Sequence, residues 1–177
     1  EQMKGEPYPR ILLQQSNRKL EELLEIRRQE LENANREALY YARYDYLTDL
    51  MNRPFLESEV QALMKKKPYG AMMMMDVDDF KQINDSYGHV QGDLCLAEIA
   101  ECIKKAYANF GYCYRIGGDE FCVLLKSAEK EDWCKQEFLH QLEEKRRKIT
   151  FLPTVSYGSA SFSCGCCFAF CQVGGQA

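Results

Sequence analysis

The run Gly-Gly-Asp-Glu-Phe at residues 117–121 constrains the fold of this chain more than any other feature. It lies between two short apolar segments, 112–116 and 121–125, whose composition is typical of strands. Glycine adopts positive φ at little cost because it has no Cβ, so two adjacent glycines predict a hairpin between antiparallel strands. Asp119 and Glu120 would then lie at the exposed tip of a sheet beside bare backbone, which suits a metal ion and a polyphosphate.

The rest of the chain from residue 45 alternates between helical and strand patterns. Besides the hairpin, we predict strands at 69–76 and 154–162, and helices at 54–66, 79–87, 92–109 and 129–148. The hairpin and the segregated helices favour an α+β fold, in which a mostly antiparallel central sheet is flanked by helices. The first of these strands contains four consecutive methionines, which we place in the centre of the sheet rather than in a metal-binding cluster.

A long N-terminal helix is predicted ahead of this domain, because residues 11–44 are rich in helix formers and contain no Gly or Pro. With Leu13 at heptad position d, the following a and d positions hold Asn17, Leu20, Leu24, Arg27, Leu31, Ala34, Ala38 and Tyr41. This seam predicts a parallel dimeric coiled coil, with a single solvated helix as the alternative. We therefore divide the chain into a stalk at 1–44, a folded domain at 45–162 and a Cys-rich tail at 163–177, which we expect to be a non-native or truncated end.

Charge and hydropathy exclude several classes of function. The formal net charge is −4, from 23 basic and 27 acidic side chains, so the chain has no basic footprint for nucleic acid. No apolar run approaches the roughly 20 residues that cross a bilayer, and no signal-peptide pattern opens the chain. We expect a cytoplasmic protein without membrane contact of its own, or the cytosolic part of a membrane-anchored sensor. Because the chain starts at Glu1 rather than Met, we expect it to be cut from a longer protein.

A second acidic run, Asp-Val-Asp-Asp at residues 76–79, follows the methionine strand. If this strand lies beside the hairpin, Asp76 and Asp119 can face each other at one end of the sheet. Two carboxylates and a backbone carbonyl form a hard oxygen site, which favours Mg2+ or Mn2+ over zinc. The helix that follows would direct its free N–H groups to the same place, and Lys81 in its first turn would add a positive charge for phosphate. Together these parts suggest nucleoside-triphosphate chemistry.

Four motifs of the chain resemble those of the GGDEF family of diguanylate cyclases, in order and at the expected spacing. They lie at residues 45–53, at 76–85 with the following Gly88, His89, Gly92 and Asp93, at the signature 115–121, and at 155–158. The resemblance covers about residues 45–162. It implies a sheet of the nucleotide-cyclase or palm-like type in a catalytic domain that follows a signalling helix.

The resemblance also implies which residues hold the metal and carry the chemistry. Asp76 and Asp119 would bind Mg2+ or Mn2+, with the carbonyl of Val77 as a further ligand. Either Asp119 or Glu120 would assist deprotonation of the ribose 3′-hydroxyl, and both assignments stay open.

Substrate contacts are implied at Asp79, Phe80, Lys81, Asn84, Asp93, Gly117 and Gly118. The phosphates would be held by the backbone N–H groups of Asp79 and Phe80 together with Lys81. Asn84 and Asp93 would read the guanine edge. A carboxylate accepts from guanine N1–H and the exocyclic amine, a donor pair that adenine lacks.

The implied reaction condenses two GTP into cyclic di-GMP with loss of two pyrophosphates. One domain presents one GTP, so two domains must meet, and a homodimer through the N-terminal helix would hold them together. The alternative is a catalytically weak or inactive GTP-binding regulatory module dimerised by its stalk. Residues 163–177 favour this alternative, because they lack the basic helix that the family carries there. Residues 108–111 also lack the Arg-x-x-Asp product-inhibition motif of many members, so we expect no feedback through that site.

Overall fold

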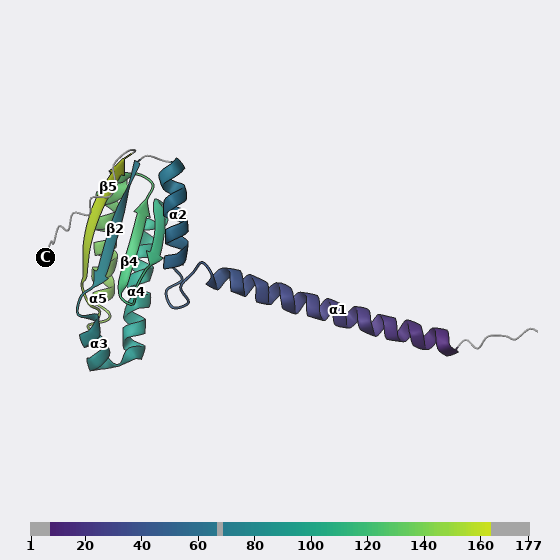
Figure 1. Ribbon diagram of the computed structural model, residues 1–177. Coiled ribbons are helices and arrows are strands. Elements are labelled where there is room, and N and C mark those ends of the chain that lie inside the picture. The colour runs from purple at the N-terminus through teal and green to yellow at the C-terminus, as the bar shows by residue number, and fades with distance from the viewer. Residues whose placement is uncertain (1–7, 67–68, 164–177) are drawn as a thin grey trace, which may run out of the picture. The chain divides into compact units, whose positions relative to one another are not determined.

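The computed structural model describes residues 8–66 and 69–163 (Figure 1). Apart from Ser163, the predicted Cys-rich tail lies outside the described residues. The chain divides into two compact units, residues 1–41 and 42–177. The elements in chain order are α1 (Tyr8–Tyr41), β1 (Met51–Asn52), α2 (Arg53–Lys66), β2 (Tyr69–Val77), α3 (Phe80–Tyr87), α4 (His89–Tyr107), β3 (Gly111–Arg115), β4 (Glu120–Leu125), the 3-10 turn η1 (Ala128–Lys130), α5 (Glu131–Arg146) and β5 (Val155–Ser163).

The first unit is the long helix α1, as predicted, and it ends at Tyr41 rather than at residue 44. Its described side chains are all exposed, including the heptad leucines Leu24 at 60% and Leu31 at 71%. Beyond its end the backbone turns, because the N–H of Asn52 donates to the carbonyl of Arg43 at 2.8 Å. Among the described residues no helix is both long and apolar enough to cross a membrane.

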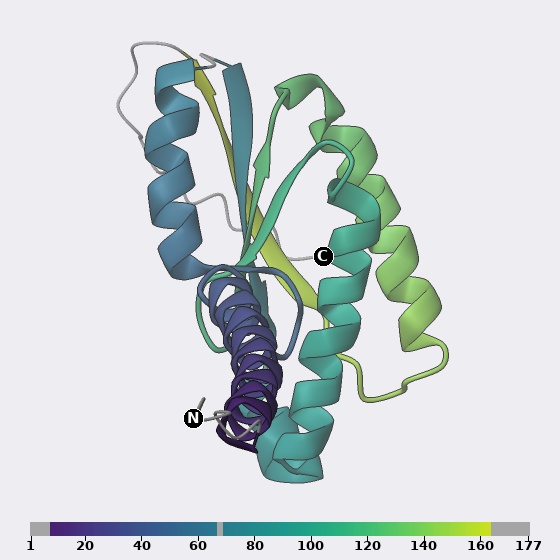
Figure 2. The same cartoon turned by 90° about the vertical axis from the view of Figure 1, so that its right-hand side faces the viewer.

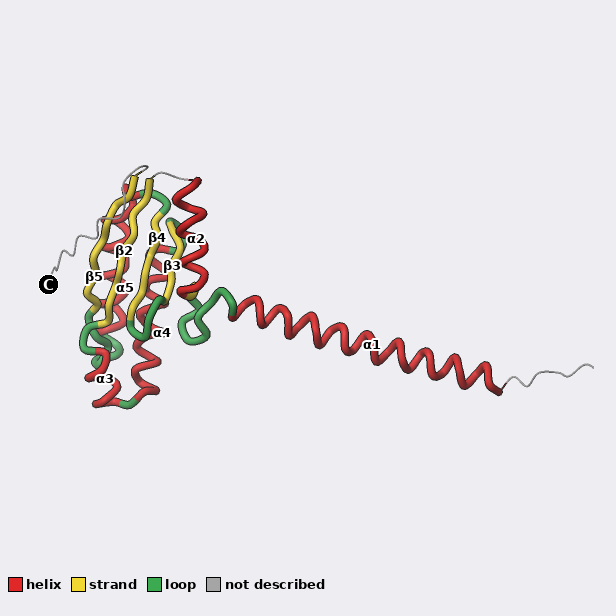
Figure 3. Tube along the Cα trace, in the orientation of Figure 1, coloured by secondary structure: helices red, strands yellow, loops and turns green. Residues whose placement is uncertain are grey.

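The described part of the second unit contains one five-stranded sheet in the order β1-β3-β4-β2-β5 (Figure 3). The pairs β3–β4, β4–β2 and β2–β5 are antiparallel, whereas the two-residue strand β1 is parallel to β3. The predicted α+β fold with a mostly antiparallel sheet is therefore confirmed. The methionine strand β2 lies inside the sheet, between β4 and β5.

Helices cover both faces of this sheet. Figure 2 shows α4 and α5 on one face and α2 on the other. Alternation along β2 explains how a run of methionines fits there: Met73 and Met75 are buried in the cluster under α4 and α5, whereas Met72 and Met74 are half-buried on the α2 side.

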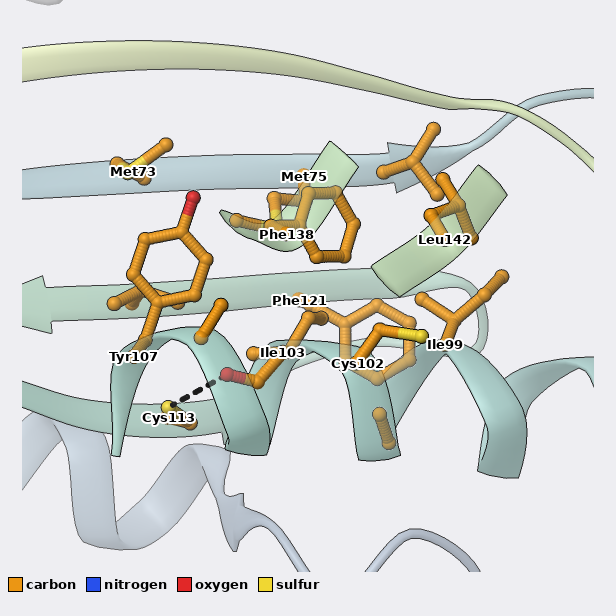
Figure 4. Packing of buried hydrophobic residues seen from close by; sticks show 14 of the residues in the cluster. Met73, Met75, Ile99, Cys102, Ile103, Tyr107, Cys113, Phe121, Phe138 and Leu142 are labelled. Carbon is orange, nitrogen blue, oxygen red and sulfur yellow. Dashed lines mark hydrogen bonds between the residues drawn. The ribbon is translucent and has the colours of Figure 1, made fainter. Parts of the chain in front are cut away.

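The larger core cluster lies between the sheet and α4 and α5 (Figure 4). Ile99, Cys102 and Ile103 of α4 are fully buried there, at the three- and four-residue spacing of one helix face. Burial raises the pKa of the Cys102 thiol to about 11, so this group stays protonated and acts as a small apolar side chain. Cys102 thus contributes packing beneath the sheet rather than a reactive thiol.

Candidate functional site

Strand pairing brings the two acidic runs together at one end of the sheet, as predicted. In the antiparallel pair β2–β4, Asp76 lies in register with Glu120. The N–H of Val77 donates to the carbonyl of Asp119 at 3.1 Å, which ties the end of β2 to the residue before β4. The partner of Asp76 across the sheet is thus Glu120, and Asp119 lies one residue further, in the turn.

The electrostatics of this end show a concentration of negative charge. Burial raises the pKa of Asp76, and the neighbouring carboxylates of Asp119, Glu120 and Asp78 raise it further. Among the described residues, no group of three His, Cys, Asp or Glu side chains is arranged to hold a metal ion. The predicted donor set needs only two carboxylates and the Val77 carbonyl. Its hard oxygens fit a divalent cation, which would also offset the repulsion that raises the pKa of Asp76.

The turn between β3 and β4 corrects one prediction. The connection spans residues 116–119, and neither Gly117 nor Gly118 has the positive φ that we predicted; Gly88 alone has it among the described glycines. Gly117 instead permits a close approach. A Cβ at this position would lie 2.4 Å from Oε2 of Glu120, so the glutamate side chain folds against bare backbone.

Arg115 braces this turn, a role that the sequence did not reveal. Its Nη2 donates to the carbonyl of Gly118 at 2.8 Å, and its Nη1 donates to Oδ1 of Asp45 at 2.9 Å. The same carboxylate oxygen accepts from the N–H and the hydroxyl of Thr48, at 2.9 and 2.7 Å. Burial alone would raise the pKa of Asp45, but the hydrogen bonds from Thr48 and Arg115 outweigh it and the pKa is lowered. The segment that follows α1 in the chain is therefore linked to the turn that carries Asp119.

Asp78 is bound to the edge strand β5, which the sequence also did not reveal. Its carboxylate accepts from the hydroxyls of Thr154 and Ser156, at 2.5 and 2.6 Å. Its N–H donates to the carbonyl of Thr154 at 3.0 Å. These three bonds hold the loop between β2 and α3 in place.

This loop leads into a helix start suited to an anion. Asp79, immediately before α3, has left-handed backbone angles of φ 54° and ψ 26°, and its side chain makes no capping hydrogen bond. A left-handed residue followed by a helix turns successive N–H groups toward one concavity, and the first N–H groups of a helix lack intrahelical acceptors. Phe80 and Lys81 open the helix, and the Lys81 side chain is exposed. The predicted phosphate-binding residues thus lie directly beyond the acidic end of β2.

The two predicted base-reading residues are brought together by the turn from α3 to α4. Gly88, with φ 85°, ends α3 and starts α4, so α4 begins at His89 rather than at residue 92 as predicted. Asn84 lies against Gly92, because a Cβ at Gly92 would be 2.0 Å from the Asn84 Oδ1. Asp93 follows on α4 and is exposed.

A cleft of about 740 Å³ adjoins the acidic end of the sheet. Asp76, Asp78 and Asp79 line it from the β2 side, and Glu143 and Arg146 line it from α5. Arg146 is the one basic side chain among its described lining residues. The acidic end is therefore open to a ligand rather than closed by packing.

Comparisons with known proteins place these features in a family. The family model described as "Diguanylate cyclase, GGDEF domain" matches residues 42–173. The bifunctional diguanylate cyclase/cyclic di-GMP phosphodiesterase MucR of Pseudomonas aeruginosa is 41% identical over 106 residues, which cover 58% of this chain and 16% of MucR. Diguanylate cyclase DgcN of Escherichia coli K12 is 38% identical over 113 residues, covering 60% of this chain and 27% of DgcN. The chain spans less than a third of the length of these two relatives.

A solved structure shares the same architecture. It is the coiled coil and GGDEF domain of DgcB from Caulobacter crescentus, crystallised in complex with c-di-GMP. It superposes with a TM-score of 0.64 at 26% identity, covering 88% of this chain and 84% of DgcB as crystallised.

Proposed function

Because the chain belongs to the GGDEF family of diguanylate cyclase domains, we propose that its domain at 45–162 condenses two GTP into cyclic di-GMP with release of two pyrophosphates. The observation that carries this proposal is the pairing of β2 with β4, which gathers Asp76, Asp119 and Glu120 at one sheet end. The loop into α3 lies next to them. The names of MucR and DgcN, and the c-di-GMP bound to DgcB, support the same activity.

Asp76, Asp119 and the Val77 carbonyl would hold Mg2+ or Mn2+. Burial raises the pKa of Asp76, and the carboxylates of Asp119, Glu120 and Asp78 raise it further; this gathering of negative charge supports the assignment. A bound divalent ion supplies charge neutralisation at the triphosphate and lowers the pKa of the attacking hydroxyl.

The chain itself binds and orients the substrate. The N–H groups of Asp79 and Phe80, with Lys81, would hold the phosphates so that the α-phosphate faces the incoming 3′-oxygen. Asp119 or Glu120 would accept the proton of that 3′-hydroxyl. Asn84 and Asp93 would bind the guanine edge, with the carboxylate accepting from N1–H and the exocyclic amine.

One domain presents one GTP, so the reaction needs two domains face to face. We propose that α1 forms a homodimeric coiled coil that keeps two domains at high effective concentration. An upstream sensor in a longer protein would act through this stalk. The heptad leucines are exposed in the single chain, which leaves their apolar surface available to a second copy.

The stalk makes a measurable prediction. The double substitution Leu24→Glu with Leu31→Glu places charges at two a positions, and we expect the solution mass to fall from two chains to one. A matched control is Ile26→Glu with Leu39→Glu, which changes two residues at positions c and b that are also more than half exposed. Light scattering should show a dimer for the control. A dimer that survives the a-position changes would contradict a stalk joined by this seam.

Turnover of GTP tests the proposed activity. The chain is incubated with GTP and Mg2+, and nucleotides are separated by chromatography, beside Asp119→Asn. We expect cyclic di-GMP from the unchanged chain and none above background from the variant. GTP that binds tightly but stays unconverted would instead support the regulatory module.

A further inference from the structure

We propose that Gly92 is a positioning residue for guanine selection, which it controls through Asn84; this rests on the proposed function. Gly92 is buried on α4, and its backbone lies against the carboxamide of Asn84 on α3. A Cβ there would be 2.0 Å from Oδ1 and 3.0 Å from Cγ of Asn84. It would also be 3.3 Å from Cζ of Phe80.

The backbone around this contact is fixed. The N–H of Gly88 donates to the carbonyl of Asn84 at 2.9 Å, and the N–H of Gly92 donates to the carbonyl of Gly88 at 3.2 Å. Gly88 has φ 85°, a value that residues with a side chain rarely adopt, so the turn depends on glycine at this position. The α carbon of Asn84 therefore cannot retreat easily, and the absence of a side chain at Gly92 decides where the carboxamide lies.

The polar end of Asn84 is available to a ligand. Among the described residues its carboxamide makes no hydrogen bond in the structure, although it is half-buried between α3 and α4. Asp93, the next residue after Gly92, is exposed on the same helix. A carboxamide N–H donor suits guanine O6, and the carboxylate suits N1–H and the amine. Adenine carries an amino donor where guanine has O6, and it lacks the N1–H. Moving Asn84 should therefore weaken the binding of a guanine nucleotide far more than that of an adenine nucleotide.

Alanine at Gly92 should change function without disturbing the fold. The nearest atom is the end of a flexible side chain, so Asn84 can rotate away while both helices stay in place. Alanine also favours a helix more than glycine does. The expected consequence is a displaced carboxamide, a lost hydrogen bond to the base, and a melting temperature equal to or above that of the unchanged chain.

The experiment measures binding to the full chain in Mg2+, using GTP and ATP analogues with a methylene group between the α- and β-phosphates to block transfer. Gly92→Ala should raise the Kd of the guanosine analogue about tenfold, the effect of losing about one hydrogen bond. The Kd of the adenosine analogue should stay within about twofold. Asn84→Ala should act similarly, and adding Gly92→Ala to it should change little, because the clashing atoms are gone.

Gly158→Ala on β5 is the matched control, since a Cβ there meets nothing within 4 Å. Gly158→Ala should leave the Kd of both analogues and the melting temperature unchanged. The inference would be overturned if Gly92→Ala binds the guanosine analogue like the unchanged chain, weakens the binding of both analogues equally, or fails to fold. If the unchanged chain fails to bind the guanosine analogue at all, the proposed function fails and this inference fails with it.

Discussion

Asp76→Asn should abolish cyclic di-GMP formation and leave the domain folded, with a melting temperature equal to or above that of the unchanged chain. Asp76 lies in register with Glu120, and its pKa is raised by burial and by the surrounding carboxylates. A raised carboxyl pKa means that folding disfavours the ionised form, so a neutral isostere relieves repulsion. The same change removes a proposed metal ligand, and we expect turnover to fall by at least about a thousandfold.

The matched control is Asp132→Asn, in the first turn of α5. This helix begins after β4 has crossed the sheet away from the acidic end. The turnover of Asp132→Asn should stay within about twofold of that of the unchanged chain, because a surface substitution away from the site has only a small effect. Measured activity that survives Asp76→Asn would contradict the assigned metal site, whereas unfolding of the variant would contradict the electrostatic account.

Arg115→Ala should cost about 2 kcal/mol or more of unfolding free energy, because it removes the positive partner of the Asp45 carboxylate and the hydrogen bond to the Gly118 carbonyl. The side chains of Arg115 and Asp45 are only 13% and 18% exposed. Chemical denaturation measures the loss. Arg147→Ala is the control, since its ion pair with Glu144 is 69% and 48% exposed and should contribute less than about 0.5 kcal/mol.

Acid should reduce the difference between the unchanged chain and Arg115→Ala. The pKa of Asp45 is lowered in the folded state, so its contribution is present above the ordinary aspartate pKa of about 3.9 and is lost as pH falls through the folded-state value. A stability difference that stays constant down to that range would show that the ion pair contributes nothing. Equal losses in Arg115→Ala and Arg147→Ala would contradict its bracing role.

The sequence was sufficient to predict the neighbours of the acidic strand end. The apolar runs that flank residues 117–121 predicted β3 and β4, and the buried character of the methionine run predicted that β2 would lie inside the sheet. Placing Asp76 beside the hairpin followed from that pairing. The register could not be predicted, because the turn spans residues 116–119 rather than two glycines.

The contacts that support the site come from residues too far apart in sequence to be paired by pattern. Asp45 and Arg115 are 70 residues apart, and the strand β1 that joins their segments has two residues, too short for a periodic signal. Asp78 and Thr154 are 76 residues apart and meet only because β2 pairs with the edge strand β5. The residues of each pair do lie within or beside the motifs that we singled out. For Asp45 and Arg115, the opposite charges of the two motifs were the available signal that they pair.

The most direct test of the central claim counts both products of the unchanged chain with GTP and Mg2+. We expect cyclic di-GMP by chromatography, with two pyrophosphates released for each molecule formed. We also expect chelation of the divalent ion to stop both. Pyrophosphate release without cyclic di-GMP, or no conversion of bound GTP by a folded dimer, would contradict the proposal that this domain is a diguanylate cyclase.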